Sequence, residues 1–340
     1  YHIHPPTVVK KVGDIVPVEM EAWEQEHRHH HIQTRKLKSL GDSISSRIPL
    51  FFNTDVILSK ANAVDSMDYL YRNGHHDECL FVHGGKGTLK TNFGSLNLAY
   101  GDYAIIPRGV IWQLDVIEPL ELFITETAGP IETPNRYRNK LGQLLEHSPY
   151  SERDIKTPVL GDPQPDGPIE VKVRLAQGLQ SYEYKHHPFD VVGWDGYYFP
   201  WVFNVNDFMP ITGKVHQPPP VHQVFQAPGL VICNFVPRLF DYHPEAVPAP
   251  YAHSNVDSDE ILYYVAGDFM SRKGMEKGSI TYHPAGLPHG PQPGKIEASL
   301  GAKEANEIAV MVDTFKPLKM TKAAGSIDDP EYPLSWLDES

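Results

Sequence analysis

Runs of β-branched and aromatic residues, separated by glycine and proline about every ten residues, set the pattern of the first half of the chain. The clearest runs are ECLFVHGG (78–85), GTLKTNFG (87–94), LNLAYG (96–101), DYAIIPRG (102–109) and LELFITET (120–127). Such runs are typical of the strands of a β-sandwich or β-barrel. Helical periodicity is scarce, and its best candidate is the segment 135–148, where Tyr137, Leu141 and Leu144 would lie on one face. We therefore predict an all-β protein with one or two short connecting helices.

A two-part spacing pattern occurs twice along the chain. In each copy six residues separate a glutamate from a glycine, and a G-x5-P-x-G pattern follows. The first copy consists of Glu78, Gly85, Gly101, Pro107 and Gly109, and the second of Glu260, Gly267, Gly278, Pro284 and Gly286. The second copy ends in His289, as the second motif of cupin barrels does, whereas the first has Trp112 at that place. The chain therefore resembles a bicupin, a protein of two jelly-roll β-barrels.

The length of 340 residues favours about two domains. The repeated pattern gives their positions. The predicted division is an N-terminal arm (1–44), a first barrel (45–130), a connector (131–185), a second barrel (186–318) and a C-terminal tail (319–340).

The second barrel contains a candidate metal site formed by His253, Glu260 and His289. Two neutral imidazoles and one carboxylate neutralise only half the charge of a divalent ion and leave coordination positions open, as in non-haem Fe(II) oxygenases. In a barrel, inward side chains from adjacent strands converge on one point while the wall excludes bulk water. We therefore predict Fe(II) as the cofactor.

The first barrel is predicted to be metal-free, although His75, His76 and Glu78 lie near its first motif. The position that should hold a histidine is Trp112, and an indole donates one hydrogen bond but cannot bind a metal ion as a ligand. The first copy is therefore expected to keep the fold without the site.

Four stretches resemble the homogentisate 1,2-dioxygenase family of bicupin Fe(II) enzymes. They are HPFDVVGWDGYYFPWVFNVNDF (187–208), GKVHQPPPVHQVF (213–225), YAHSNVDSDE (251–260) and LPHGP (287–291). The resemblance is strong over about 187–292, weaker through the first barrel and poor at both ends. It implies opening of the ring of homogentisate, 2,5-dihydroxyphenylacetate, by O2 to give maleylacetoacetate in tyrosine and phenylalanine catabolism.

The resemblance also implies roles for individual residues. His253, Glu260 and His289 match the iron ligands of the family. His216 matches a histidine that binds a ring hydroxyl and acts as an acid and base, a role suited to a group with an ordinary pKa near ~6.5. His283 matches a second histidine near the substrate and oxygen, and its alternative role is to orient a ligand.

The chain departs from the family at two places. Glu260 lies seven residues after His253, where the family has six, so Asp259 occupies the usual place; the preserved interval to Gly267 favours Glu260. Phe269 replaces a tyrosine that helps to hold the substrate. Either another donor compensates or the natural substrate carries a less polar substituent than acetate. The nearest donors in the sequence are Tyr251, Asn255 and Tyr282.

Charge and composition exclude other classes of function. A net charge of −13 without a Lys/Arg-rich block argues against a nucleic-acid partner. The chain has no apolar run of about 18 residues, so no membrane span is expected. Cys79 and Cys233 lie far apart in strand-like segments, which favours reduced thiols and a cytoplasmic protein. The expected partners are a small aromatic substrate, O2 and further copies of the chain in a homo-oligomer.

The histidine-rich run HRHHH (27–31) is flanked by charged residues. Imidazole clusters capture transition metals. The charged flanks nevertheless favour a solvated segment or a subunit contact over a functional site.

Three alternatives to the homogentisate reaction stay open. The chain could cleave the ring of another hydroquinone or hydroxylated aromatic compound. It could also be a metal-dependent cupin that is not an oxygenase, such as a zinc or manganese isomerase, because the same ligands accept several divalent ions. The third alternative is a binding or storage bicupin without turnover.

Overall fold

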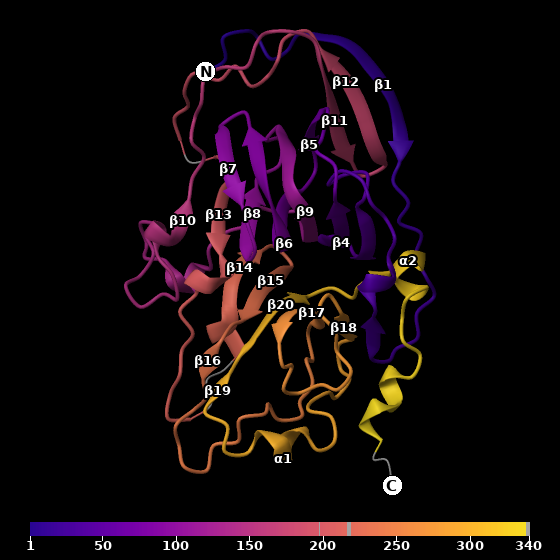
Figure 1. Ribbon diagram of the computed structural model, residues 1–340, viewed down its shortest axis with the longest axis vertical. Helices are drawn as coiled ribbons and strands as arrows, with labels where there is room; N and C mark the ends of the chain where they lie inside the picture. The colour runs from indigo at the N-terminus through magenta and orange to yellow at the C-terminus, as the bar shows by residue number, and fades with distance from the viewer. Residues whose placement is uncertain (197, 216–218, 338–340) are drawn as a thin grey trace.

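Antiparallel strands make up most of this computed structural model, which describes residues 1–196, 198–215 and 219–337. The larger sheet occupies the upper half of Figure 1 and the smaller sheet the lower half. The larger sheet contains β1 (Val9–Pro17), β3 (Ile48–Phe52), β4 (Val56–Ala63), β5 (Leu70–Asn73), β6 (Asp77–Thr91), β7 (Gly94–Leu98), β8 (Asp102–Ile106), β9 (Trp112–Thr127), β10 (Ile155–Lys156), β11 (Ile169–Leu175), β12 (Gly178–Tyr184), β13 (Trp201–Asn204) and β21 (Lys319–Met320).

The smaller sheet has the order β14-β15-β20-β17-β18-β2. Its strands are β2 (His30–Ile32), β14 (Gln223–Ala227), β15 (Leu230–Phe235), β17 (Asp259–Gly267), β18 (Ile280–His283) and β20 (Glu307–Thr314). A separate pair is formed by β16 (Arg238–Leu239) and β19 (Glu304–Ala305). The α-helices of the described chain are short and are α1 (Lys295–Ser299) and α2 (Lys322–Gly325). Its 3-10 turns are η1 (Thr34–Lys36), η2 (Asn135–Tyr137), η3 (Glu152–Asp154), η4 (Val205–Asp207), η5 (Pro219–His222) and η6 (Tyr332–Trp336).

The repeated sequence pattern corresponds to a repeated structure, which confirms the all-β bicupin fold. In the first unit Glu78 of β6 pairs with Ile106 of β8, and in the second Glu260 of β17 pairs with His283 of β18. On their other sides the two glutamates face acidic residues of β9 and β20, Glu126 and Asp313. Because side chains alternate along a strand, this shared register points both glutamates to the same face of their units.

The spaced glycines lie within the two glutamate strands, Gly85 at a bulge of β6 and Gly267 at the last position of β17. Gly85 and Gly267 have φ values of 86° and 100°, which favour glycine. A Cβ at either place would lie 2.0 Å from a backbone carbonyl oxygen, that of Pro119 or Asn306. The interval between glutamate and glycine therefore reflects a close backbone contact that leaves no room for a Cβ at this point of the strand.

Buried apolar side chains of the described residues form three clusters, of which the two larger ones bear on the site and the third lies around β5 and β11. One lies between the units and joins Phe81 and Phe123 of the first to Tyr263 and Val312 of the second. The other lies inside the first unit and contains Leu80, Ile106 and Trp112 among others. The odd-numbered side chains of β17 therefore pack between the units, which leaves Glu260 on the opposite face, inside the second unit.

The strands cross the boundaries of the predicted domains. β2 lies within the predicted arm and pairs with β18 of the smaller sheet, whereas β21 of the predicted tail pairs with β3 of the larger one. β13 follows the predicted connector and pairs with β8. The numerical domain division stays a prediction.

The predicted helix at 135–148 is wrong, because only η2 (Asn135–Tyr137) is helical there. Asn139 accepts hydrogen bonds at its side-chain oxygen from the backbone N–H groups of Leu141 and Gln143, and Gly142 has a φ of 87°. Such local side-chain bonds compete with helix formation. Of the predicted apolar face, Tyr137 is buried in the core between the units and Leu144 packs against it, whereas Leu141 is exposed.

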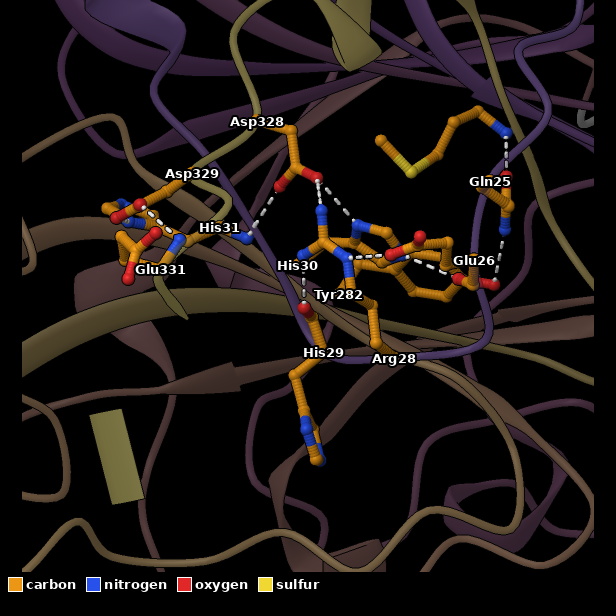
Figure 2. A network of polar contacts seen from close by, with 11 residues as sticks. Gln25, Glu26, Arg28, His29, His30, His31, Tyr282, Asp328, Asp329 and Glu331 are labelled. Carbon is orange, nitrogen blue, oxygen red and sulfur yellow. Dashed lines mark hydrogen bonds and ion pairs between the residues drawn. The ribbon is translucent and has the colours of Figure 1, made fainter. Parts of the chain in front are cut away.

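The expectation that the run 27–31 is solvated is also wrong at its end. His30 and His31 are 0% and 3% exposed, since they lie in β2. Figure 2 shows Arg28 and His30 converging on Asp328, at 2.7 and 2.8 Å. The run thus joins the N-terminal segment to the C-terminal one across the smaller sheet.

Two expectations about the whole chain can be compared with the structure. Cys79 and Cys233 are free and buried, as predicted. In the part of the chain that is described, no helix has the length and apolar character needed to cross a membrane.

Candidate metal centre

His253 and His289 face each other across a short antiparallel bridge. Each backbone N–H donates to the carbonyl oxygen of the other residue at 2.8 Å. Their Nδ1 atoms lie 3.0 Å and 3.1 Å from the carbonyl oxygens of Tyr251 and Leu287. A carbonyl only accepts, so Nδ1 carries the proton in each ring and Nε2 keeps its lone pair. Both imidazoles are therefore oriented and in the tautomer that binds a metal ion through Nε2.

Glu260, at the start of β17, supplies the carboxylate. Its Oε1 accepts from Nδ1 of His283 at 2.8 Å and its Oε2 from the amide of Asn255 at 3.1 Å. Nε2 of His289 lies 3.6 Å from Oε2. One potential ligand atom from each of His253, Glu260 and His289 lies within 4.8 Å of the others. The three residues predicted as ligands therefore converge on one point.

Electrostatics favour a charged Glu260 beside a neutral His283. Burial opposes ionisation of Glu260, but its contacts with His283 and His289 hold the pKa of its carboxyl well below the usual value. Burial lowers the pKa of His283 to about 3, against the opposing effect of Glu260. The Nε2 atoms of His283 and His289 are buried and have no hydrogen-bond partner among the described residues. Buried polar atoms of this kind are normally satisfied, so these two are suited to a bound ion or substrate.

Asp259, the alternative to Glu260, points to the opposite face of β17. Its Oδ2 accepts from the Tyr282 hydroxyl at 2.8 Å and from the backbone N–H of Leu318 at 2.7 Å. Its Oδ1 accepts from the N–H of Ala285 at 2.8 Å. The structure thus places Glu260 rather than Asp259 with the two histidines, and it removes Tyr282 from the site.

The other predicted site residues differ in how closely they approach this centre. Asn255 and His283 contact Glu260 directly. Tyr251 is exposed, and its ring lies 5.7 Å from that of His253. Phe269 packs against Tyr264, with ring centroids 4.6 Å apart. His216 lies outside the described residues, so its role stays a prediction.

Two further residues near the centre were missed from the sequence. Asp313 faces Glu260 across β17 and β20, and burial together with the charge of Glu260 raises its pKa well above the ordinary value. Arg272 is buried and donates to the carbonyl of Gly290, beside His289. The sequence did hold a signal for Asp313. The strand-like runs LELFITET (120–127) and IAVMVDT (308–314) both end in an acidic residue followed by threonine, and Asp313 is the acidic residue of the second run. No local signal indicates Arg272, because the fold alone brings it here.

A cavity of about 570 Å³ is connected to the centre through Arg272, which lines it, whereas the three predicted ligands do not line it. Phe269, Arg272, Lys273 and Lys295 are among the residues that line it. Its cationic side chains outnumber Asp268, the acidic residue of the same lining. The cavity therefore favours an anionic group.

Comparisons with known proteins found similar sequences and a similar solved structure. The family described as homogentisate 1,2-dioxygenase N-terminal matches residues 53–205. A Saccharolobus solfataricus protein named "putative dioxygenase" is 46% identical over 341 residues, 99% of this chain and 88% of that protein. Homogentisate 1,2-dioxygenase of Nitrobacter hamburgensis is 30% identical over 278 residues, 76% of this chain and 61% of that enzyme. This chain thus spans less than two thirds of that enzyme's length. A solved cupin 2 conserved barrel domain protein from Leptotrichia buccalis has a TM-score of 0.41 and 10% identity, over 89% of this chain and all of the other.

Proposed function

Because this chain belongs to the homogentisate 1,2-dioxygenase family, we propose that it is an Fe(II)-dependent dioxygenase that opens the ring of a hydroquinone with O2. Homogentisate is the first candidate substrate and maleylacetoacetate the corresponding product. The reaction would place the chain in tyrosine and phenylalanine catabolism. The cytoplasmic location and the homo-oligomer stay predictions.

The convergence of His253, Glu260 and His289 is the observation that carries the proposal. The donor set fits Fe(II), because it offers two neutral nitrogen ligands and one carboxylate from a single side of the centre. When bound, Fe(II) supplies open coordination positions and a route for electrons from the aromatic ring to dioxygen. Asn255 and His283 hold the carboxylate, and backbone carbonyls fix both imidazoles, so the ligands need little reorganisation.

The chain must also move a proton, because the substrate hydroxyl loses one when it binds. His216 is proposed as that acid and base. His216→Asn should then retain iron and lower kcat by about two to four orders of magnitude, the usual contribution of positioned acid–base catalysis. Turnover at the wild-type rate between about pH 6 and 8, around the ordinary histidine pKa, would reduce His216 to a structural role.

The substituent on the ring is proposed to be anionic. Phe269 cannot donate the hydrogen bond that the family's tyrosine gives. Arg272, however, is a buried cation with no carboxylate partner among the described residues, and it lines the cavity together with Phe269. A buried charge of this kind is stabilised by a counter-ion. This favours an acetate-bearing ring over an alkyl-hydroquinone.

Oxygen uptake by enzyme loaded anaerobically with Fe(II) tests the function. We expect uptake with homogentisate and less or none with gentisate, hydroquinone and 3-hydroxyanthranilate. Uptake with another of these compounds alone would change the substrate and keep the reaction class. Retained metal without uptake on any dihydroxy aromatic compound would overturn the dioxygenase assignment. A zinc- or manganese-dependent reaction would then be the next hypothesis.

A further inference from the structure

Three neighbouring strands at one edge of the larger sheet end at the same level. β12 lies between β1 and β11, and Tyr184 of β12 pairs with Val9 of β1 and with Ile169 of β11. The segments that precede β1 and β11 and the segment that follows β12 therefore leave the sheet together. In Figure 1 this edge lies at the top, whereas β17 and β18 lie in the lower half.

Each of these segments brings one potential metal ligand, namely His4, Asp166 or His186. Nδ1 of His186 lies 3.1 and 3.0 Å from the two carboxylate oxygens of Asp166, and Nε2 of His4 lies 3.9 Å from Oδ2. The His4 and His186 rings are stacked, with centroids 4.3 Å apart and planes 2° apart. One ligand atom from each residue lies within 4.8 Å of the others. Ligands about 2.0–2.1 Å from a tetrahedral zinc ion are separated by roughly 3.3 Å. Binding would therefore require a closer approach of the three ligand atoms and a rotation of one of the stacked rings, so that both nitrogen lone pairs point to the ion.

Asp190 provides an independent reason to expect a metal here. Its Oδ2 lies 3.2 Å from Nδ1 of His4 and accepts from the His4 backbone N–H at 2.7 Å. Asp190 is only 4% exposed. A carboxylate that holds one ring nitrogen of a histidine fixes the other as an acceptor, which is the usual support of a metal-binding histidine. Nε2 of His4 is thereby directed to Asp166.

We propose that His4, Asp166 and His186 form a second metal site, which binds a divalent transition ion such as Zn²⁺. Two imidazoles and one carboxylate favour zinc, nickel or copper over calcium or magnesium, whose ligands are oxygen atoms. Water completes the coordination, because Asp166 is exposed and the two histidines are partly so. The site shares no residue with the proposed iron centre, so either can fail without the other.

The ion acts as a clip on the edge strand. β1 is exposed along nearly its whole length, so it buries little apolar surface and is held mainly by its pairing with β12. An ion bound to His4 would join the segment before β1 to the segment before β11, which carries Asp166, and to the segment after β12, which carries His186. Metal ligation of this kind adds its binding free energy to the stability of the elements that it joins.

Zinc stoichiometry in a chain without the iron centre tests the proposal. The parent is the double variant His253→Ala/His289→Ala, saturated with Zn²⁺ and desalted before elemental analysis. We expect one zinc per chain, lost in both His4→Ala and Asp166→Asn. The control is His147→Ala, because His147 is also an exposed histidine and belongs to neither cluster. Asp190→Asn should weaken zinc binding about 10- to 100-fold, as expected for the loss of a carboxylate that supports a ligand.

Hydrogen exchange locates the bound ion. Zinc should slow exchange of the β1 amides in the parent and in His147→Ala, but not in Asp166→Asn. Asp166 is exposed, so its amide variant keeps the fold even if His4→Ala does not. A parent that retains no zinc overturns the proposal. So does zinc that persists in Asp166→Asn, or that leaves β1 exchange unchanged.

Discussion

The two units place a glutamate at the same position of equivalent strands, yet among the described residues only the second unit surrounds it with metal-binding groups. Glu260 lies among His253, His283 and His289. Glu78 accepts instead from Nη1 of Arg47 at 2.6 Å and from the indole of Trp112 at 3.2 Å. Trp112 stands where the second unit has His289, and Ile106 where it has His283.

The difference shows that the shared strand pairing does not determine whether the glutamate binds a cationic side chain or a metal ion. Arg47 neutralises Glu78 inside the first unit, and both side chains are nearly inaccessible, at 8% and 1%. Burial alone would lower the pKa of Arg47, but the charge of Glu78 raises it above its usual value. In the first unit the Arg47 side chain thus balances the charge of the glutamate, as a bound metal ion would in the second unit. The prediction of a metal-free first barrel has this physical basis, and metal analysis tests it.

The largest expected effect separates two adjacent carboxylates. Glu260→Ala should abolish iron retention and turnover while the fold persists, because Glu260 faces the histidines. Asp259→Ala should keep the iron and lower stability, because it removes the acceptor of the Leu318 and Ala285 N–H groups. Iron analysis, oxygen uptake and thermal unfolding measure the three quantities. The ligand assignment would be reversed if Asp259→Ala lost the iron and Glu260→Ala retained it.

The equivalent change in the first unit should act on stability alone. Glu78→Ala leaves Arg47 buried without its main counter-ion, which costs about 3–5 kcal/mol of unfolding free energy. Iron content and kcat of the folded fraction should not change. The control is Glu118→Ala, whose exposed pair with Lys86 should contribute only about 0–1 kcal/mol. Loss of iron in Glu78→Ala would place metal in the first unit.

The junction between the units predicts a pH dependence. Nδ1 of His83 bonds to the Tyr263 hydroxyl, to which Lys60 donates at 2.7 Å. Burial lowers the pKa of His83 from 6.5 to about 4. Above pH 6.5 His83 is neutral whether the chain is folded or unfolded. Between pH 6.5 and about 4 only the unfolded chain gains the proton. The free energy of unfolding therefore decreases as the pH is lowered from 6.5 to about 4, and below that it no longer changes through His83.

Denaturant unfolding of wild type and His83→Gln at several pH values measures this contribution. The stability difference between them should decline by up to about 3 kcal/mol across that interval. His147→Gln is the control, because His147 is exposed. A constant difference between the His83 variant and wild type would show that His83 does not contribute.

The smallest expected effect concerns Phe269, where the second unit departs from its own family. Phe269→Tyr restores a hydroxyl that can donate a hydrogen bond to a charged ring substituent. A hydrogen bond to a charged group contributes about 1.5–3 kcal/mol. We therefore expect kcat/KM for homogentisate to rise roughly 10- to 150-fold. Arg272→Met should lower that constant and leave an uncharged alkyl-hydroquinone unaffected. A wild type that prefers the uncharged ring, with reversal in Phe269→Tyr, would remove the homogentisate assignment and keep ring cleavage.

The sequence alone contained the features that depend on short intervals. The distances from Glu78 to Gly85 and from Glu260 to Gly267 follow from close backbone contacts that exclude any Cβ, so they are visible as fixed spacings. The strands of the first unit were predicted for the same reason, since alternation and turn residues act locally. These intervals were enough to indicate two cupin units and one histidine-containing site.

Tertiary structure decided whatever depends on residues distant in the chain. The choice between Glu260 and Asp259 follows from the face of β17 that turns inward, which neighbouring strands set. The neutralisation of Glu78 depends on Arg47, and the burial of His30 on Asp328, nearly the whole chain away. Local periodicity also predicted a helix wrongly at 135–148, where the Asn139 side chain accepts hydrogen bonds from nearby backbone N–H groups. Spacing records local steric limits, whereas the pairing of charges and the burial of a face depend on contacts that form only when the chain has folded.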